Sequence, residues 1–268
     1  MTMRALAGCL AAIFLAAVLG VSSPCHGQPV SGERYLTYTG IAEAPQGRRF
    51  LYGEKHILVF RGDALAERVV LYTCKDGSAF ARKTSSYVRA ESPDFLLEDS
   101  SNGMREGVRS EGGGRQVFFR AALSDRERSS TLHEPSGLVV DTGFDFFVRD
   151  RWQALVEGDD LTMRFLLPSH LSDMGFKVQH LRADRIDGVP VDVFRLTLSS
   201  VFGWLVPGID VYYSTQDHLL KRYVGLSDLL DATGDNIRVD IRFGVADRRA
   251  ADEHDLTSAL QARLEPCR

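Results

Sequence analysis

Apolar and polar residues alternate along most of this chain, in short runs separated by turn residues. Four of these runs form two pairs, each split by a Gly-Asp or Asp-Gly turn: 55–61 with 68–74, and 176–181 with 191–198. Such pairs are typical of antiparallel hairpins. From Ile237 to Phe243 the alternation is strict, which predicts a strand with one buried and one solvated face.

One segment has a helical period instead. Its apolar residues recur at i, i+3, i+4, i+8 and i+11: Phe144, Phe147, Val148, Trp152 and Leu155. This single stripe predicts a helix over 144–155, which Thr142 is expected to cap and Gly158 to end. A second, short helix is expected at 251–264.

Together these elements predict an α+β fold. We expect a large curved antiparallel sheet, or incomplete β-barrel, covered by the central helix and followed by a short C-terminal helix. The cover is expected because an antiparallel sheet with one wet face buries the other. Residues 28–268 are expected to form a single β-rich domain; a division near Gly143 into two sheet halves is the alternative.

The N-terminus predicts export. Arg4 precedes an apolar run from Ala5 to Val21, and small residues precede Gln28. This pattern indicates a signal peptide over 1–27, cleaved after Gly27. An uncleaved membrane anchor is the alternative, although the run is at the short edge for spanning ~30 Å of hydrocarbon.

No lipid anchor is expected. The apolar stretch follows Cys9 instead of preceding it, and Pro24 stands before Cys25 where a lipidation signal needs a small residue. No second apolar run approaches membrane-span length, so the mature chain is not predicted to be an integral membrane protein. Arginine outnumbers lysine, which indicates a GC-rich bacterial genome, and we therefore expect a periplasmic or secreted protein of the bacterial envelope.

Charge and cysteine content narrow the partners further. Cleavage removes Arg4, so the net charge of −4 becomes −5, and nucleic acid is not an expected partner because its binding needs a basic face. Cys74 and Cys267 remain after cleavage. An oxidising compartment favours a disulfide between them, with two unpaired thiols as the alternative.

No catalytic motif is present. The sequence has no GxSxG, HExxH, P-loop or GxGxxG pattern, so no catalytic residue, cofactor or enzymatic activity is predicted. The histidines and cysteines of the mature chain do not have the spacing of metal ligands, and no metal site is expected.

Aromatic residues are concentrated in the middle and later parts of the chain. We expect four of them to line one apolar ligand cavity beneath the sheet: Phe147, Trp152, Phe165 and Trp204. Three features lead to this expectation: the apolar stripe of the helix, the alternating strand after it, and the aromatic stretch that ends at Pro207-Gly208. Ordinary core packing is the alternative for all four.

The segment Asp210–Phe243 carries a resemblance. It reads DVYYSTQDHLLKRYVGLSDLLDATGDNIRVDIRF and covers roughly an eighth of the chain. It resembles the C-terminal hairpins of the periplasmic lipoprotein-carrier (LolA/LolB-like) superfamily and of related uncharacterised half-barrel families. The resemblance implies a curved, incomplete barrel that wraps helices and binds acyl chains or other apolar ligands in its concave face.

Three functions remain open at this point. The first is non-enzymatic binding of a lipid-like or otherwise apolar ligand in the envelope. The second is a protein-interaction or envelope-assembly factor with an envelope protein as partner, and the third is an enzyme whose site has no recognised motif. A ligand cavity, an apolar outer patch, and convergent ionisable groups would favour the first, second and third respectively.

Overall fold

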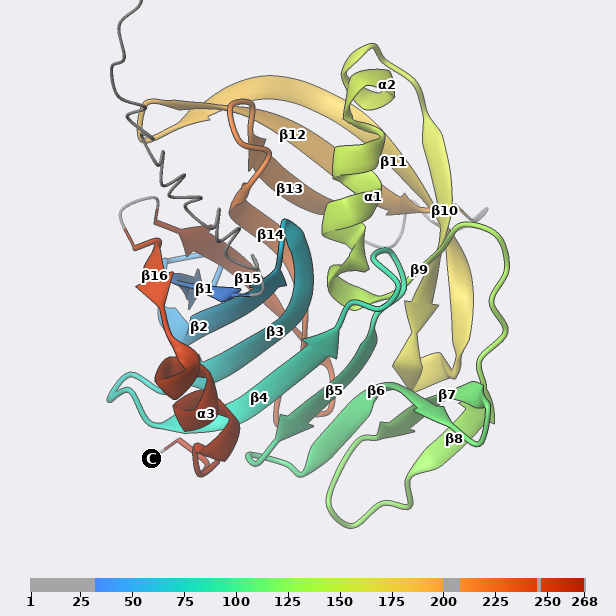
Figure 1. The fold of residues 1–268 in the computed structure, drawn as a ribbon, viewed down its shortest axis with the longest axis vertical. Coiled ribbons are helices and arrows are strands. Elements are labelled where there is room, and N and C mark those ends of the chain that lie inside the picture. Colours follow the sequence, from blue (N-terminus) through green and yellow to red (C-terminus); the bar gives the residue numbers. More distant parts are fainter. Residues whose placement is uncertain (1–31, 200–207, 245–246, 268) are drawn as a thin grey trace, which may run out of the picture. The chain divides into compact units, whose positions relative to one another are not determined.

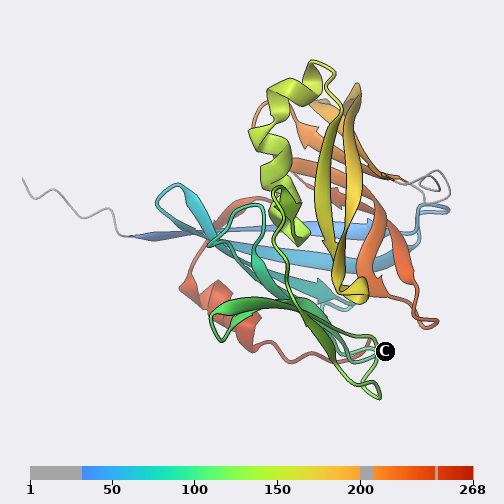
Figure 2. The same cartoon turned by 90° about the vertical axis from the view of Figure 1, so that its right-hand side faces the viewer.

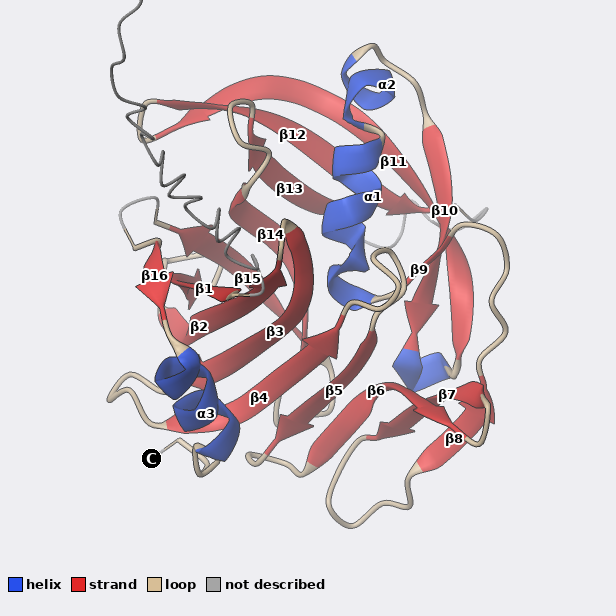
Figure 3. Cartoon of the chain, in the orientation of Figure 1, coloured by secondary structure: helices blue, strands red, loops and turns tan. Residues whose placement is uncertain are grey.

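The computed structural model describes residues 32–199, 208–244 and 247–267. They belong to one compact unit, Ser31–Arg268. Sixteen strands form a single sheet that dominates this unit (Figure 3). All strand pairs are antiparallel except that of β9 with β10. The predicted signal peptide lies outside the described residues.

The strands form two meanders in which each strand pairs with its neighbour in sequence. The first contains β1 (Glu33–Glu43), β2 (Phe50–Arg61), β3 (Ala64–Thr73), β4 (Ala79–Ser86), β5 (Asp94–Asp99), β6 (Met104–Glu111), β7 (Gly114–Arg120) and β8 (Arg128–Thr131). The second contains β9 (Leu138–Val139), β10 (Leu161–Leu167), β11 (Ser172–Ile186), β12 (Val189–Leu198), β13 (Ile209–Ser214), β14 (Leu220–Leu230) and β15 (Asn236–Phe243). The meanders join where β1 pairs with β15, and the short β16 (Arg249–Ala251) also pairs with β1.

The sheet curves so that its two edges approach each other (Figures 1 and 2). A 3₁₀ turn after β10, Pro168–His170, lies against β6 and β7. Arg128 of β8 donates a hydrogen bond to the carbonyl oxygen of Ser169 at 2.8 Å. The predicted incomplete barrel is therefore the observed architecture, because the edges meet through this turn without a shared strand ladder.

Two clusters of buried apolar residues lie on the inner, concave face. The first core cluster includes Tyr52, Val70, Tyr72, Leu97, Phe119 and Phe243. The second core cluster includes Phe144, Phe147, Val178, Phe194, Val211 and Tyr213. Leu220 and Tyr223 of β14 are only partly buried and pack against both clusters, so they connect the two.

The predicted central helix is broken in two. It consists of α1 (Phe144–Asp150) and α2 (Trp152–Val156), with Arg151 outside helical geometry at φ −114° and ψ 16°. The predicted cap is wrong: Gly143 is the N-cap, and the Thr142 hydroxyl instead contacts the Tyr87 hydroxyl at 2.5 Å. The cause is a 3₁₀ turn, Asp141–Gly143, that precedes α1 and takes Thr142 out of the capping position.

Helix α1 packs against only part of the sheet. Its Phe144, Phe147 and Val148 belong to the second core cluster, together with residues of β10 to β13. Figure 1 shows α1 lying across the inner side of these strands. Opposite the first meander, the packing comes from strands of the second meander and from residues 132–140.

The C-terminal helix packs on the opposite, outer face. This helix, α3 (Glu253–Gln261), is shorter than the predicted 251–264 and is capped by the Asp252 side chain, which accepts from the Asp255 N–H. Ala259 of α3 is buried against Ile57 and Val69. Within the described ranges, no helix combines the length and the apolar character needed to cross a membrane.

The predicted disulfide is confirmed. Cys74, directly after β3, is bonded to Cys267 with a Cα–Cα distance of 5.5 Å. The bond closes a loop of 193 residues and ties the segment after α3 to the end of β3. Next to it, the Glu265 N–H donates to the Ala79 carbonyl oxygen at 2.9 Å.

Candidate functional site

The inner face of the first meander carries buried charged residues among its apolar ones. They are Glu54 and His56 on β2, Arg68 on β3, Lys83 on β4 and Glu106 on β6. The register pairs Lys83 with Leu97, and Leu97 with Glu106. Glu106 is therefore two strands from Lys83 in the same row, which separates their backbones by about 10 Å.

Lys83 bridges two carboxylates, one in the 3₁₀ turn after β9 and one on β14. Its Nζ lies 2.6 Å from Asp141 Oδ1 and 2.7 Å from Asp228 Oδ2. The side chains of Lys83 and Asp141 are buried, whereas 43% of the Asp228 side chain is exposed. We call Lys83, Asp141, Asp228 and Glu106 the interior ion cluster; Asp228 is the member that solvent reaches most readily.

The carboxylates of Asp141 and Asp228 are both placed by irregular backbone. Asp141 has a left-handed backbone, with φ at 46°. Two residues later Gly143 lies so close to the Glu91 carbonyl oxygen that a Cβ would collide with it, so only glycine lets the turn dock there. Asp228 lies between Leu226 and Leu230, where the register of β14 against β15 shifts. Such irregularities redirect side chains.

Electrostatics keeps Lys83 protonated. Burial by itself would lower the pKa of Lys83, but the charges of Asp141 and Asp228 outweigh it, and the pKa is well above the usual lysine range. Lys83 is therefore a fixed cation at neutral pH.

Glu106 is the member of the cluster without a partner. Its side chain is buried and forms no hydrogen bond or ion pair with any other residue in the described ranges. Burial, followed by the charge of Asp228, raises the pKa of Glu106 well above its usual range. Asp141 Oδ2 is likewise buried with no hydrogen-bond partner. The cluster thus contains one acceptor without a donor, Asp141 Oδ2, and one carboxyl that keeps its proton, Glu106.

Glu106 should make the stability of the protein depend on pH. Since the folded state raises the pKa of Glu106, it holds a proton that the unfolded state releases above about pH 4.5. Glu106→Gln should therefore gain stability relative to the wild type as pH rises above 4.5, by about 1.4 kcal/mol for each unit by which the pKa is raised. Urea unfolding between pH 4 and 8 measures this. Glu111→Gln, exposed on the same strand, is the control, and parallel curves for all three proteins would contradict the assignment.

A second buried ion pair attaches α1 to the first meander. Arg68 Nη2 donates to Asp145 Oδ2 at 3.1 Å, and the Tyr213 hydroxyl donates to Asp145 Oδ1 at 2.7 Å. Burial would raise the pKa of Asp145, but the charges of Arg68 and Arg149 lower it overall. Asp145 is thus an ionised anchor for the helix.

Three of the four aromatic residues expected at a ligand site are brought together. Phe147 is buried in the second core cluster, and Trp152 and Phe165 are partly buried against it. The Trp152 ring stacks on His218 at 3.8 Å and meets Phe194 edge-on at 5.0 Å. Trp204, the fourth, lies outside the described residues. Their common role in ligand binding remains a proposal.

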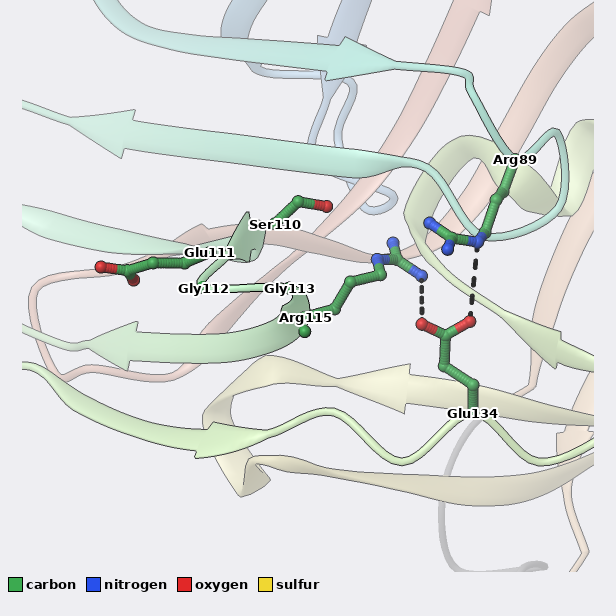
Figure 4. Close-up of a pocket in the computed structure, with 8 residues that line it drawn as sticks. Arg89, Ser110, Glu111, Gly112, Gly113, Arg115 and Glu134 are labelled. Atoms are coloured by element: carbon green, nitrogen blue, oxygen red, sulfur yellow. Dashed lines mark ion pairs between the residues drawn. The ribbon is translucent and has the colours of Figure 1, made fainter.

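A polar pocket of about 410 Å³ lies on the surface between the β6–β7 turn and residues 89 and 134. In Figure 4, Arg89 and Arg115 both point toward Glu134. Arg115 Nη1 lies 3.3 Å from Glu134, and its Nε and Nη2 donate to Asp94 and to the Ser92 carbonyl oxygen. Arg89 also pairs with Glu134, at 3.7 Å, so both arginines that line this pocket already have a carboxylate partner.

A second pocket, of about 380 Å³, lies on the outer face beside α3. Its apolar lining includes Val69, Leu96, Phe118 and Leu260, and charged residues such as Arg105 flank it. Leu260 is 42% exposed. We call this pocket the outer groove. Across the described residues, no group of three His, Cys, Asp or Glu side chains could hold a metal ion.

No protein-family model matches this chain, and no curated protein matches it. Among solved structures, it is similar to a β-barrel-like protein of the domain of unknown function DUF1849 from Brucella abortus. The identity is 10% and the TM-score 0.46, over 82% of this chain and 98% of that one. It is also similar to a DUF1329 family protein from Desulfovibrio piger, at 8% identity and a TM-score of 0.32 over 88% and 93% of the two chains.

A LolA superfamily protein from Nitrosomonas europaea is also similar, at 8% identity and a TM-score of 0.23 over 84% of this chain and 89% of that one. The superfamily that Asp210–Phe243 resembles is thus among the similar structures.

Proposed function

We propose that this protein is exported to the bacterial envelope and binds a lipid-like ligand, without catalysis, on the inner face of its incomplete barrel. The observation that carries the proposal is a set of partly buried apolar side chains on that face. Trp152, Phe165, Leu220 and Tyr223 pack against the core and still keep accessible surface, and the last two connect both core clusters. An acyl chain laid along them would bury this surface, which is favourable by about 25 cal/mol per Å².

The state of the interior charges supports binding over catalysis. Lys83 is paired with two carboxylates, and its raised pKa removes it as a nucleophile or base at neutral pH. Arg68 is likewise held by Asp145. These cations are structural partners, and we assign no catalytic residue.

Trp152→Ala should separate a ligand role from a packing role. Because the Trp152 side chain is only partly buried, its loss should cost about 1–3 kcal/mol of unfolding free energy, below the ~3–5 kcal/mol of a fully buried aromatic. Binding of a fluorescent fatty-acid probe to the folded variant should fall several-fold. Probe titration at a temperature where circular dichroism shows the variant folded measures this.

Val193→Ala is the matched control for this experiment. Val193 is buried with Val191 and Tyr212 in a separate small cluster, and the next residue, Phe194, contacts Trp152 on the other face. Its truncation should cost about 1–2 kcal/mol and leave probe binding unchanged. Equal loss of binding in both variants would assign the effect to stability and contradict the ligand role of Trp152.

Export is tested separately. The mature protein recovered from the periplasm should begin at or near Gln28, without Cys9 and Cys25, and should carry no acyl group. N-terminal sequencing and intact mass measure this. An intact Met1, or a diacylglycerol-modified cysteine, would refute this part of the proposal.

The outer groove favours the second candidate function, interaction with an envelope protein. It places the exposed Leu260 beside the partly exposed Leu96, over the buried Phe118, on the face opposite the proposed ligand surface. An exposed apolar side chain at a groove flanked by charged residues is typical of a protein contact. The two functions use different faces and can coexist.

A further inference from the structure

We infer that the interior ion cluster binds the ammonium group of an aliphatic amine whose chain lies along the apolar inner face. The inference deepens the proposed function and rests on it for the placement of the chain. The apolar residues of the inner face select an apolar chain, and the ion cluster selects the polar group at the end of that chain.

The charge balance of the cluster favours a cation. Lys83 supplies one positive charge, while Asp141 and Asp228 supply two negative ones. The neighbouring Arg68 is matched by Asp145 and adds no excess positive charge. Arg248, which lies over the Tyr38 ring, and Lys221 share Asp217 as an ion-pair partner, each at 3.9 Å. Within the cluster itself, a carboxylate or phosphate would add negative charge beside two carboxylates that already share the single ammonium of Lys83.

The hydrogen-bonding groups favour a donor. Glu106 is buried without a hydrogen-bond partner, and Asp141 Oδ2 is buried and unpaired. Leaving the Asp141 oxygen unpaired costs about 1–3 kcal/mol, so a ligand that supplies a donor recovers this energy. An ammonium group carries three donors and no acceptor, which matches Asp141 Oδ2, the accessible carboxylate of Asp228 and the carbonyl oxygen of protonated Glu106.

The path to the cluster is consistent with an attached chain. Asp228 is 43% exposed, and it lies on β14, the strand that also carries Leu220 and Tyr223. These two residues continue the apolar surface toward Trp152 and the second core cluster. A ligand with its amine at Asp228 thus has partly buried apolar side chains along its chain.

Four probes separate the ammonium group from the chain: dodecylamine, dodecanol, dodecanoate and ethylamine, each below its aggregation concentration. Isothermal titration of the full mature chain should show dodecylamine binding roughly tenfold or more tightly than dodecanol, and dodecanoate binding most weakly. Ethylamine should bind far more weakly than dodecylamine. Ethylamine as tight as dodecylamine would instead assign the site to a free small amine and overturn the aliphatic chain.

Two variants locate the effect. Asp228→Asn removes one negative charge and retains an oxygen for Lys83, and Glu106→Met removes the unpartnered carboxyl without leaving a buried polar group. Each should reduce the preference for dodecylamine over dodecanol roughly tenfold, because the charged ammonium loses more than the neutral hydroxyl. Asp63→Asn, in the exposed turn between β2 and β3, makes the same charge change and should have no effect. Thermal melts establish that each variant is folded.

The outcomes distinguish the two proposals. Equal binding of dodecylamine, dodecanol and dodecanoate, or tightest binding of dodecanoate, would overturn the ammonium site while leaving apolar ligand binding intact. An unchanged dodecylamine preference in both folded variants would also overturn it. Binding of none of the twelve-carbon probes would remove the proposed function and, with it, the ligand class inferred here.

Discussion

Lys83→Met should lower the free energy of unfolding by about 3–5 kcal/mol, one of the two largest losses expected for this protein. The substitution retains most of the side-chain volume but leaves Asp141 buried without a cation, and an uncompensated buried charge has this cost. Urea unfolding at pH 7, followed by circular dichroism, measures it. The loss should shrink at low pH, where the two carboxylates become protonated.

Lys55→Met is the control for charge and side-chain length. Lys55 lies on β2, its side chain is 36% exposed, and it pairs with Asp255 at 3.5 Å. Exposed pairs contribute about 0–1 kcal/mol, so this variant should lose little. Similar losses for both lysines would show that the cluster around Lys83 does not behave as a buried ion pair.

Removing the disulfide should cost about 5 kcal/mol. The Cys74–Cys267 bond closes a loop of 193 residues, and loop-closure entropy in the unfolded chain gives this estimate. Cys74→Ala, Cys267→Ala and the double variant should all be destabilised to a similar extent, because each one breaks the same bond. Thermal and urea unfolding with and without a reductant measures this, and reductant should shift only the wild type.

Additive losses would contradict this assignment. If the double variant lost as much stability as the two single variants combined, the effect would come from side-chain packing, with Cys74 buried beside the first core cluster. Peptide mapping without reductant provides the direct check, since the linked peptide must be present in the wild type.

Much of the sheet was predictable because its signals are local. The paired runs around Gly62-Asp63 and Asp187-Gly188 are the β2–β3 and β11–β12 hairpins, and Ile237–Phe243 is part of β15. Turn chemistry and alternation together indicate such hairpins. Strand β5, Asp94–Asp99, was not predicted; it is short and begins and ends with an acidic residue.

The helix illustrates a different limit. Its apolar stripe was correctly identified, but the break at Arg151 and the 3₁₀ turn at Asp141–Gly143 depend on contacts from far along the chain. Arg151 reaches Glu91 with its Nη1 at 2.5 Å, and Gly143 docks against the same residue's carbonyl. A local capping pattern contains no information about these partners.

The interior ion cluster was missed, although a signal for it exists. The strands β3, β4 and β6 are among those that contain adjacent charged residues: Glu67-Arg68, Arg82-Lys83 and Arg105-Glu106. Because successive side chains point to opposite faces, one member of each pair must point inward in a sheet with a buried face. In all three pairs the second member is the buried one. What could not be predicted is that Asp141 and Asp228 lie opposite them.

The seam between β1 and β15 has a consequence for how the chain acquires its structure. Every other long ladder joins strands that are neighbours in sequence, so those hairpins close short loops at little entropic cost. The seam pairs Gly40 with Phe243, and the chain between them must already be ordered before this contact is favourable. A chain emerging N-terminus first would therefore expose the open edge of β1 until synthesis and transport of β15 are complete. Throughout that interval the unpaired edge can add a strand from another molecule, which makes it the point at which chaperone protection matters most for this fold.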